Sequence, residues 1–403
     1  MTDKDEKFFE KKMDRREFLK KAGIGGAGLA LGLSGASAFF APKLGNQENI
    51  SYGNEKINFY GKQAGITTPM QKNIYFVVLD LHTTDKDKII QLFKDWTDYS
   101  SKLVEGELVK KDGQNALLPP SDTGETVGLN PHRLTLTFGV SASFLKKMNL
   151  EQKRPQLFKD LPPFPKEQLR EKYTGGDIVI QACADDEQVA FHAIRNLIRK
   201  GRNAVTLRWS QSGFAAIGDR LETPRNLFGF KDGTANVTKE KDFDRVVWAD
   251  SKDWMQNGSY MAVRRIQMFL DTWDRTNLEE QENTFGRYKE SGAPFGKKNE
   301  FDEVDLSLLP DDSHVRLAKE VDKPLLRRSY SYSDGIDEKT GQFDTGLLFI
   351  SFQKDPDHFV KVQTNLGATD KMNEYVTHIG SGLFACFGGV EKGGYIGQKL
   401  LED

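Results

Sequence analysis

The sequence is poor in cysteine, which limits its metal and cross-link chemistry. Only Cys183 and Cys386 occur among the 403 residues. Two cysteines cannot form a zinc site of the paired CxxC type. Both lie in apolar stretches, so we expect two buried thiols, with a single disulfide as the alternative.

Short catalytic motifs and an excess of basic charge are also lacking. The chain contains no HExxH, GxSxG or P-loop sequence, and its six histidines show no paired metal-ligand spacing. The 57 Lys and Arg residues are balanced by 59 Asp and Glu residues, a net charge of −2. A nucleic-acid-binding protein normally has a basic excess, so we expect no nucleic-acid partner.

The composition favours a folded chain with a sizeable core. Hydrophobic residues make up 37% of the sequence and charged residues 29%, which argues against general disorder. The length suggests two domains of ordinary size or one large domain.

The N-terminal segment has the features of an export signal. Arg15–Lys20 reads RREFLK, an uncharged run rich in Gly and Ala follows over Ala22–Pro42, and Ala36–Ala38 is a small-x-small cleavage sequence. This order resembles the twin-arginine export signal. We therefore expect residues 1–42 to be a twin-arginine signal peptide, read by the twin-arginine translocase. The mature chain would be periplasmic, at the cell surface or secreted; the sequence leaves open whether the signal is cleaved or kept as an anchor.

The remaining chain shows the same strand–helix pattern twice. Residues 43–71 are polar and rich in glycine, and we interpret them as a linker. A strand rich in Val, Tyr and Phe at 73–83 precedes a helical pattern, and a second strand–helix pair follows within 177–201. In the second half a strand at 259–271 precedes a helical pattern at 273–288. Near the C-terminus another strand leads into a helix that begins with acidic residues.

This repetition predicts an internal duplication. We expect an α+β fold in which each half is an antiparallel sheet with helices on one face. The domains are placed at 72–215 and 216–403, with the boundary near Ser212–Thr223.

Two segments of the second half could carry chemistry. The stretch GFKDGTAN (229–236) contains Asp232 between Lys231 and Gly233, which by itself is typical of a turn. His314 opens a short helix in DDSHVRLAKE, and an arginine pair that begins at Arg327 follows thirteen positions later in LLRRSYSYS. A lone histidine is a weak sign of a ligand, and His82 and His192 read as structural or surface residues.

Taken in order, these segments resemble one enzyme family. GFKDG, then SHVR, LRRSYSYS and GLLFISFQKD, is similar to the dye-decolourising haem peroxidases, and above all to their EfeB subgroup, the exported deferrochelatase/peroxidases of iron-uptake systems. The resemblance covers essentially the whole chain, and the twin-arginine signal belongs to the same subgroup. It implies two ferredoxin-like halves with haem b in the C-terminal one.

The resemblance also implies roles for single residues on the two faces of the haem. His314 would be the axial ligand of the haem iron. Its carboxylate partner could be Asp355, Asp357 or neither, and the sequence does not choose among these alternatives. Asp232 would be the distal acid that moves a proton, and Arg327 the distal arginine.

Other residues would contact the macrocycle or relay electrons. Gly233, Thr234 and Ala235 would line the haem, and Gly229 would let the backbone approach it closely. Arg316 and Arg287 could each pair with a propionate. The aromatic residues that could relay electrons, or could simply pack, are Tyr330, Tyr332, Trp209, Trp248 and Trp254.

Three functions stay open at this point. The first is a haem peroxidase that uses hydrogen peroxide and an unidentified reductant. The second is a deferrochelatase that takes haem as substrate and releases its iron with the tetrapyrrole intact. The third is a non-catalytic exported protein that binds haem or iron and delivers iron to a membrane permease. The oligomeric state is also open and includes a homo-oligomer.

Overall fold

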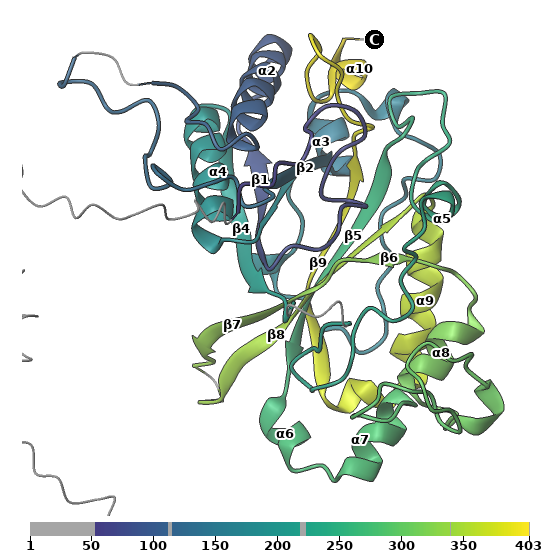
Figure 1. Cartoon of the computed structure of the whole chain (residues 1–403). Coiled ribbons are helices and arrows are strands. Elements are labelled where there is room, and N and C mark those ends of the chain that lie inside the picture. The colour runs from purple at the N-terminus through teal and green to yellow at the C-terminus, as the bar shows by residue number, and fades with distance from the viewer. Residues whose placement is uncertain (1–52, 112–114, 218–222, 339, 403) are drawn as a thin grey trace, which may run out of the picture. The chain divides into compact units, whose positions relative to one another are not determined.

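The computed structural model describes residues 53–402, apart from 112–114, 218–222 and 339 (Figure 1). The expected signal peptide at 1–42 lies outside the described residues, as do residues 43–52. In the part of the chain that is described, no helix is long and apolar enough to cross a membrane.

The N-terminal half folds as a βαββαβ unit. The side chains of Asp85 and Asp186 accept backbone N–H groups in the first turns of its two long helices and so fix where these helices begin. Both helices bury one apolar face. The elements of this half are β1 (Asn73–Leu81), α2 (Lys86–Leu103), β2 (Thr135–Val140), α3 (Ala142–Lys147), β3 (Ile178–Ala184), α4 (Glu187–Gly201) and β4 (Val205–Phe214), with short 3-10 turns at Glu151–Lys153 and Glu171–Tyr173.

The C-terminal half repeats this strand order with more helices between its strands. Its elements are α5 (Glu240–Val246), β5 (Ser259–Met268), α6 (Leu270–Asp274), α7 (Leu278–Phe285), α8 (His314–Glu320), β6 (Leu326–Arg327), β7 (Tyr330–Ile336), β8 (Phe343–Gln353), α9 (Pro356–Thr369), β9 (Val376–Cys386) and α10 (Gln398–Leu401), with 3-10 turns at Leu306–Leu308 and Lys371–Glu374.

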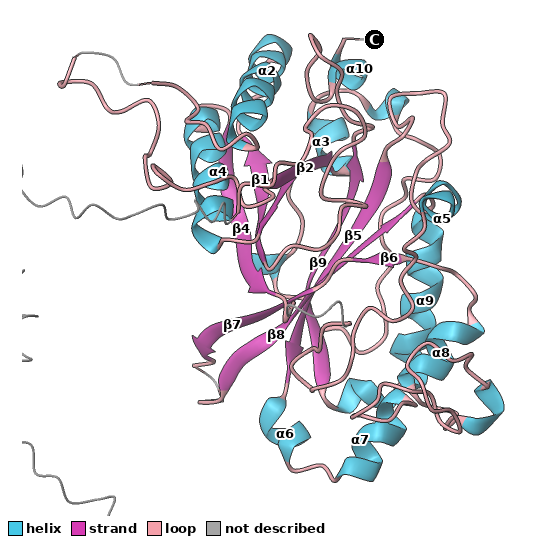
Figure 2. Cartoon of the chain, viewed as in Figure 1, coloured by secondary structure: helices cyan, strands magenta, loops and turns pink. Residues whose placement is uncertain are grey.

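The pairing of the strands is the same in both halves. The fourth strand pairs with the first, the first with the third, and the third with the second, all antiparallel; this gives β4-β1-β3-β2 and β9-β5-β8-β7. The order is ferredoxin-like, so the predicted α+β fold with two similar halves is confirmed. Figure 2 shows α2 and α4 together beside the N-terminal strands and α9 along the C-terminal strands.

The two sheets are joined, although we expected one separate sheet in each half. β2 pairs with β9 through Gly139 and Cys386, and β4 pairs with β7 through Phe214 and Ser331. Because β5 also pairs with β8, the eight long strands form a closed ring. An edge strand leaves N–H and C=O groups unpaired, and each half satisfies those of the other.

The core lies on both sides of this ring. One cluster packs α2 and α4 on β1, β2 and β3, with the Trp96 indole donating to the Leu197 carbonyl at 2.8 Å. A second cluster takes residues from both halves, among them Phe76, Trp209 and Ile350. Cys183 and Cys386 are both buried and free, so the alternative of a disulfide is not found.

Two local expectations differ from the structure. The helical pattern at 273–288 is divided into α6 and α7, because the Asn277 side chain accepts from the N–H of Glu280 at 3.0 Å and starts a new helix. The described part of the expected linker, 53–71, packs on the folded body instead. Phe59 and Ile66 are buried, and the Gln63 side chain donates to the carbonyls of Phe138 and Phe387.

Candidate active site

His314 is the first residue of α8, a helix held between a loop and the end of α9. The Asn365 side chain of α9 donates to the Leu317 carbonyl at 2.7 Å, which ties the two helices together. The N–H of Lys371 donates to the carbonyl of Asp312 at 3.0 Å, which ties the chain before His314 to the turn after α9. These bonds bring the first turn of α8 to the C-terminal end of α9.

The carboxylate partner of His314 is Asp370. Nδ1 of His314 donates to Oδ2 of Asp370 at 2.7 Å. The Asp370 side chain is only 3% exposed, and its other oxygen accepts the N–H of Met372 at 2.8 Å, so its orientation is fixed. Burial lowers the pKa of His314 and Asp370 raises it, with a net rise above the usual value.

Of the three alternatives for this partner, Asp355, Asp357 or neither, the structure selects neither. Asp355 caps the start of α9, where its side chain accepts the N–H of Asp357, and Asp357 pairs with Lys361 at 2.6 Å. A helix of 14 residues is about 21 Å long. The acids at its start therefore lie far from His314, whereas Asp370 at its end lies beside it.

The other ring nitrogen of His314 remains available. Because a carboxylate can only accept a hydrogen bond, Nδ1 carries the proton, and in the neutral imidazole Nε2 then has its lone pair free. Nε2 has no hydrogen-bond partner among the described residues, and the side chain is 31% exposed. The histidine therefore has the tautomer and the orientation of a metal ligand.

Asp232 and Arg327 form an ion pair close to this histidine. Nη1 of Arg327 donates to Oδ1 of Asp232 at 3.0 Å, and the side chains are 27% and 21% exposed. Both charges act on the pKa of His314, Arg327 lowering it and Asp232 raising it. The three residues thus belong to one electrostatic site, although 82 residues separate Asp232 from His314 in the chain.

Asn236 fixes the backbone at Arg327. Its Nδ2 donates to the Arg327 carbonyl at 2.7 Å, and its Oδ1 accepts the N–H of Arg327 at 2.9 Å. The N–H of Asp232 donates to the Pro224 carbonyl at 2.8 Å. The ion pair therefore joins two backbone segments that are already held in place, which favours a preorganised site.

Glu300 fixes Lys231 and Thr234, which flank Asp232 and Gly233 in the turn. Lys231 donates to it at 2.6 Å and Thr234 at 2.8 Å, and its side chain is 8% exposed. Burial raises the pKa of Glu300 and the bond from Lys231 lowers it, with a net fall. Sequence reasoning did not identify Glu300, Asn236 or Asp370, because no local pattern marks a contact between distant loops.

The ion pair lines a cavity with walls from both halves. Gly233 lies beside Asp232 with φ 129°, a conformation that favours glycine, and a Cβ there would meet nothing nearer than Thr223 at 3.5 Å. Met70 and Phe214 reach the cavity from the N-terminal half. The other lining residues come from the connection between the halves and from the C-terminal sheet: Ala215, Ala216, Pro224, Arg225, Asn226, Asn236, Ser329, Ser331 and Leu347.

An aromatic cluster forms the apolar side of the site. Phe230 and Phe285 stack at 3.9 Å between ring centroids, and Phe285 lies 6.4 Å from the His314 ring. Leu347 packs against this buried cluster and also lines the cavity, so apolar side chains connect the His314 side of the site to the ion pair.

The structure gives the other residues expected at the haem the following surroundings. Thr234 is turned to Glu300, and Ala235 is exposed. Gly229 has φ 83°, and a Cβ there would lie 2.9 Å from Lys289, so it serves a turn rather than the cavity. Thr234 and Ala235 are not among the residues that line the cavity around Asp232, and their contact with haem stays a prediction.

The two arginines expected at the propionates differ from each other. Arg316 binds Glu320 and Asp311 and donates to the carbonyls of Leu306 and Leu309, so it holds the loop before its own helix. Arg287 is 8% exposed, and its Nη1 donates to the carbonyls of Gly292 and Glu300.

Arg287 is the better placed of the two cations. Burial lowers its pKa, Glu300 raises it and the charge of Arg327 lowers it, with a net fall. Arg287 therefore lies within electrostatic reach of the cavity.

The aromatic residues considered as relays are packed in the core. Tyr330, Tyr332 and Trp209 are buried, and the Tyr332 hydroxyl donates to the Ile266 carbonyl at 3.1 Å. Trp248 and Trp254 are also buried, each within a hydrophobic cluster. Their role in electron transfer stays a prediction.

Two protein-family models match the chain. The model described as "Dyp-type peroxidase, N-terminal" matches residues 63–215, and "Dyp-type peroxidase, C-terminal" matches residues 223–391. The chain belongs to the DyP-type peroxidase family. The two models follow the two ferredoxin-like halves, and the resemblance seen in the sequence is confirmed.

Similar proteins and solved structures align with most of the chain. A deferrochelatase of Escherichia coli (strain K12) is 38% identical over 374 residues, which cover 86% of this chain and 88% of the relative. The deferrochelatase of strain UTI89 is 37% identical over 413 residues and 96% of each chain. A solved DyP-type peroxidase from Streptomyces coelicolor is 37% identical with a TM-score of 0.82, over 88% of this chain and 99% of that one.

The DyP-type site described above fits a haem. A neutral imidazole with a free Nε2, backed by a carboxylate, is the donor that a peroxidase iron requires. A buried aromatic cluster beside it keeps that side of the site apolar, which suits a macrocycle. A carboxylate–guanidinium pair on the cavity wall can handle a proton and a negative charge.

Proposed function

We propose that this chain is a haem peroxidase that uses hydrogen peroxide, with haem b held through Nε2 of His314. The observation that carries the proposal is the pairing of a histidine whose Nδ1 is bonded to a buried carboxylate with the Asp232–Arg327 ion pair nearby. Ferric DtpA from Streptomyces lividans, a solved relative with 37% identity and a TM-score of 0.81, supports the iron cofactor. When bound, haem supplies the redox-active iron at which peroxide is reduced.

Asp232 would move the proton. Reduction of hydrogen peroxide requires that one oxygen loses a proton and the other gains one, so that water can leave. A carboxylate at hydrogen-bond distance can take and return this proton, and such help is typically worth about 10²- to 10⁴-fold in rate. The bond from Arg327 at 3.0 Å leaves the second oxygen, Oδ2, for the substrate.

Arg327 would stabilise negative charge. Its guanidinium is always protonated, so it can attract the charge that develops on oxygen as the O–O bond breaks. Asn236 holds its backbone on both sides, so this charge is in place before the reaction.

Asp370 would orient and polarise the ligand. Its bond to Nδ1 fixes the ring and makes Nε2 more electron-rich. Because Asp370 is itself bonded to the N–H of Met372, the ring has little freedom to turn.

We also propose deferrochelatase activity in iron supply, because the relatives with that name align over most of the chain. Release of iron with the tetrapyrrole intact requires two protons for the pyrrole nitrogens, and Asp232 could pass them from solvent one at a time. A non-catalytic carrier is less favoured, since binding alone needs no preorganised acid–arginine pair. Export by the twin-arginine translocase and delivery to an iron permease complete the proposal.

Two assays test these activities separately. Purified haem-loaded chain is mixed with hydrogen peroxide, and the change in its absorption spectrum is followed by stopped flow. The same protein is incubated with excess haem and a ferrous chelator, and the fluorescence of metal-free protoporphyrin is measured. A spectrum that peroxide leaves unchanged would refute the peroxidase, and fluorescence no higher than that of denatured protein would refute iron release.

The export proposal has its own test. An Arg15→Lys, Arg16→Lys double variant should keep the protein in the cytoplasm when cell fractions are blotted. Equal export of the variant and the wild type would contradict the signal.

A further inference from the structure

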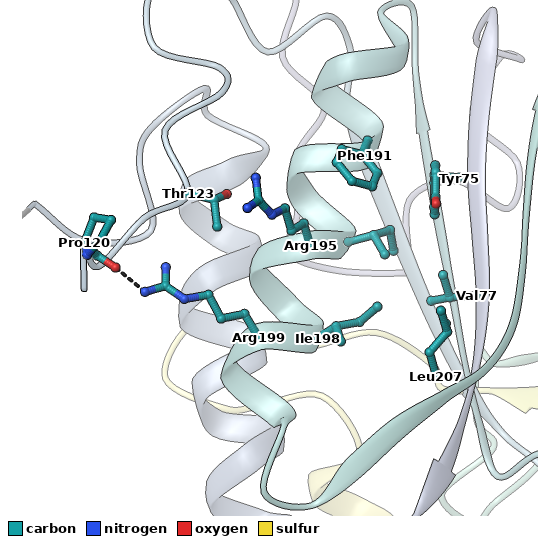
Figure 3. Close-up of a pocket in the computed structure, with 10 residues that line it drawn as sticks. Tyr75, Val77, Pro120, Thr123, Phe191, Arg195, Ile198, Arg199 and Leu207 are labelled. Carbon is teal, nitrogen blue, oxygen red and sulfur yellow. Dashed lines mark hydrogen bonds between the residues drawn. The ribbon is translucent and has the colours of Figure 1, made fainter.

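A second cavity lies on the N-terminal half, between α4 and the strands β1 and β4 (Figure 3). Its volume is about 520 Å³, within the usual range of small-molecule sites. None of its lining residues lines the cavity around Asp232. Leu207 borders it on β4, whereas Phe214 of the same strand reaches the proposed haem cavity. Seven residues of strand place the two sites about 23 Å apart. We call it the α4 cavity.

The floor of the α4 cavity is apolar and partly uncovered. Val77 and Ile194 are fully buried, but Leu207 is 48% exposed and Phe191 38% exposed. The rings of Tyr75 and Phe191 lie 5.2 Å apart at 59°, an arrangement into which a further aromatic ring can pack (Figure 3). In the isolated chain this apolar surface is in contact with water, which favours a ligand with an apolar body.

One edge of the cavity carries two cations from α4. Phe191, Arg195 and Arg199 are spaced four residues apart, so they form a single stripe along the helix. Arg199 donates to the backbone carbonyls of Ser121 and Pro120 and is held by them. Arg195 is 52% exposed and donates one bond, from Nη1 to Glu125 at 3.2 Å. Its other N–H groups have no partner within the described part of the chain.

Hydrogen bonds to α4 hold the rim of the cavity that lies opposite the sheet. The N–H of Thr123 donates to Oδ1 of Asn196 at 3.3 Å, and Nδ2 of Asn196 donates to the Thr123 hydroxyl at 2.8 Å. His192, 2% exposed, lies 3.6 Å from Asp122 and 3.2 Å from Glu125. These buried polar contacts fasten the rim to α4.

We propose that the α4 cavity binds an aromatic carboxylate or sulfonate. The ring would lie on the apolar floor beside Tyr75 and Phe191, and the anion would accept hydrogen bonds from the unpaired side of Arg195. Charge-assisted bonds of this kind are about twice as strong as neutral ones. A cationic ligand finds no acidic side chain among the lining residues, and the nearby Glu125 carboxylate already accepts a hydrogen bond from Arg195.

Calorimetry on the haem-loaded chain tests the proposal, since haem then occupies its own site. The probe is 8-anilinonaphthalene-1-sulfonate, and the matched neutral probe is N-phenyl-1-naphthylamine, which lacks the sulfonate. We expect one sulfonate probe to bind per chain, about fivefold or more tighter than the neutral probe. Dodecanoate, an anion without a ring, should bind more weakly than the sulfonate.

Variants locate the binding. Arg195→Ala should weaken the sulfonate probe about fivefold and leave the neutral probe unchanged. Ile198→Trp should fill the cavity and abolish binding of both. Arg202→Ala removes an exposed arginine at the end of the same helix, outside the cavity, and should change nothing. The haem absorption band serves as the check on folding in each variant.

Three results would overturn the proposal. The sulfonate probe could fail to bind, or bind equally to wild type, Arg195→Ala and Ile198→Trp. The neutral probe could bind as tightly as the sulfonate, which would leave only a non-selective apolar surface. Sedimentation could show a dimer that Leu207→Lys converts to a monomer, which would assign the face to a second copy of the chain. Each result is independent of the reaction with peroxide.

Discussion

The two halves share a strand order, but they differ in what connects the first strand to the second. In the N-terminal half this connection contains α2, a continuous helix of 18 residues with one buried face. In the C-terminal half it contains three short helices, α6, α7 and α8, of 5, 8 and 7 residues. His314 opens the last of them. The repeated strand order gives the two halves the same fold, whereas the connection with three short helices places His314 at the candidate site.

The second helices of the two halves show the same contrast. α4 and α9 both begin at a capping aspartate, Asp186 and Asp355. At their other ends, α4 stops at Arg202, an exposed residue, whereas α9 stops at Asp370, which is buried and bonded to His314. The N-terminal caps of α4 and α9 therefore have the same structural role, whereas only the C-terminal end of α9 contributes to the site.

The largest expected effect is the loss of haem in His314→Ala. Without Nε2 the iron has no protein ligand, so the reconstituted variant should lack the Soret band of the wild type. The matched control is His82→Ala, which changes an exposed histidine of the N-terminal half and should bind haem fully. Full haem binding with an unchanged spectrum in His314→Ala would contradict the assignment of the haem ligand to the C-terminal half.

The next effect is kinetic. Asp232→Asn should keep its haem but react with hydrogen peroxide about 10²- to 10⁴-fold more slowly, because an amide cannot take the proton. Asp244→Asn, at an exposed residue paired with Lys62, is the control and should react at the wild-type rate. Stopped-flow absorption gives both rates, and equal rates would exclude Asp232 from the reaction.

Asp370→Asn and Asp355→Ala compare the two ends of α9 directly. Loss of the carboxylate behind the ligand should weaken haem retention or activity about 10- to 100-fold. Loss of the cap should instead cost about 0.5–2 kcal/mol of stability with no effect on haem. Haem transfer to apomyoglobin and thermal unfolding separate the two outcomes. The reverse pattern would show that the carboxylate at the start of α9 is the functional one.

The last effects concern two glutamates that fix loops, one in each half. Burial raises the pKa of Glu125 and hydrogen bonds from Thr123, His192 and Arg195 lower it, to about 2; the pKa of Glu300 is also lowered. The unfolded value is near 4.5. Each ionised carboxylate therefore stabilises the folded chain above about pH 4.5, and this contribution is lost as the pH falls toward the folded value.

Substitution of each glutamate by glutamine makes this measurable. Glu125→Gln and Glu300→Gln should each lower the free energy of unfolding by about 1–3 kcal/mol at pH 7, and by less at pH 3. Urea unfolding of the haem-free chain at both pH values gives these differences. Only Glu300→Gln should also slow the peroxide reaction, because Glu300 holds the turn that carries Asp232. An equal effect of Glu125→Gln on that rate would contradict the division between the halves.

Much of the fold could be predicted from local patterns. Strands at 73–83 and 259–271 and the helices that begin at acidic residues follow from periodicity and capping, which depend on neighbouring residues. The closure of the ring could not be predicted in this way. It depends on pairs such as Gly139 with Cys386, whose edges meet only after both halves have folded.

The site was predictable to the same extent. The order of the motifs indicated His314, Asp232 and Arg327 as one group, and the structure brings them together. Asp370 was missed, because the distance from a histidine to an acid at either end of a helix is set by tertiary packing. The sequence predicts a linker at 53–71 because the segment is polar. In the structure, polar side chains of this segment such as Gln63 and Gln71 are buried and donate hydrogen bonds within the fold.

The closed ring also determines when the site can exist during synthesis. Met70, near the N-terminal end of the described chain, lines the cavity around Asp232. The sheet is completed by β9, near the C-terminal end. A ribosome-bound fragment that lacks β9 has neither the β2–β9 nor the β5–β9 pairing, and it lacks Asp370 as well if it ends before α9 is complete. We therefore expect only the finished chain to retain haem, with cofactor loading after translation.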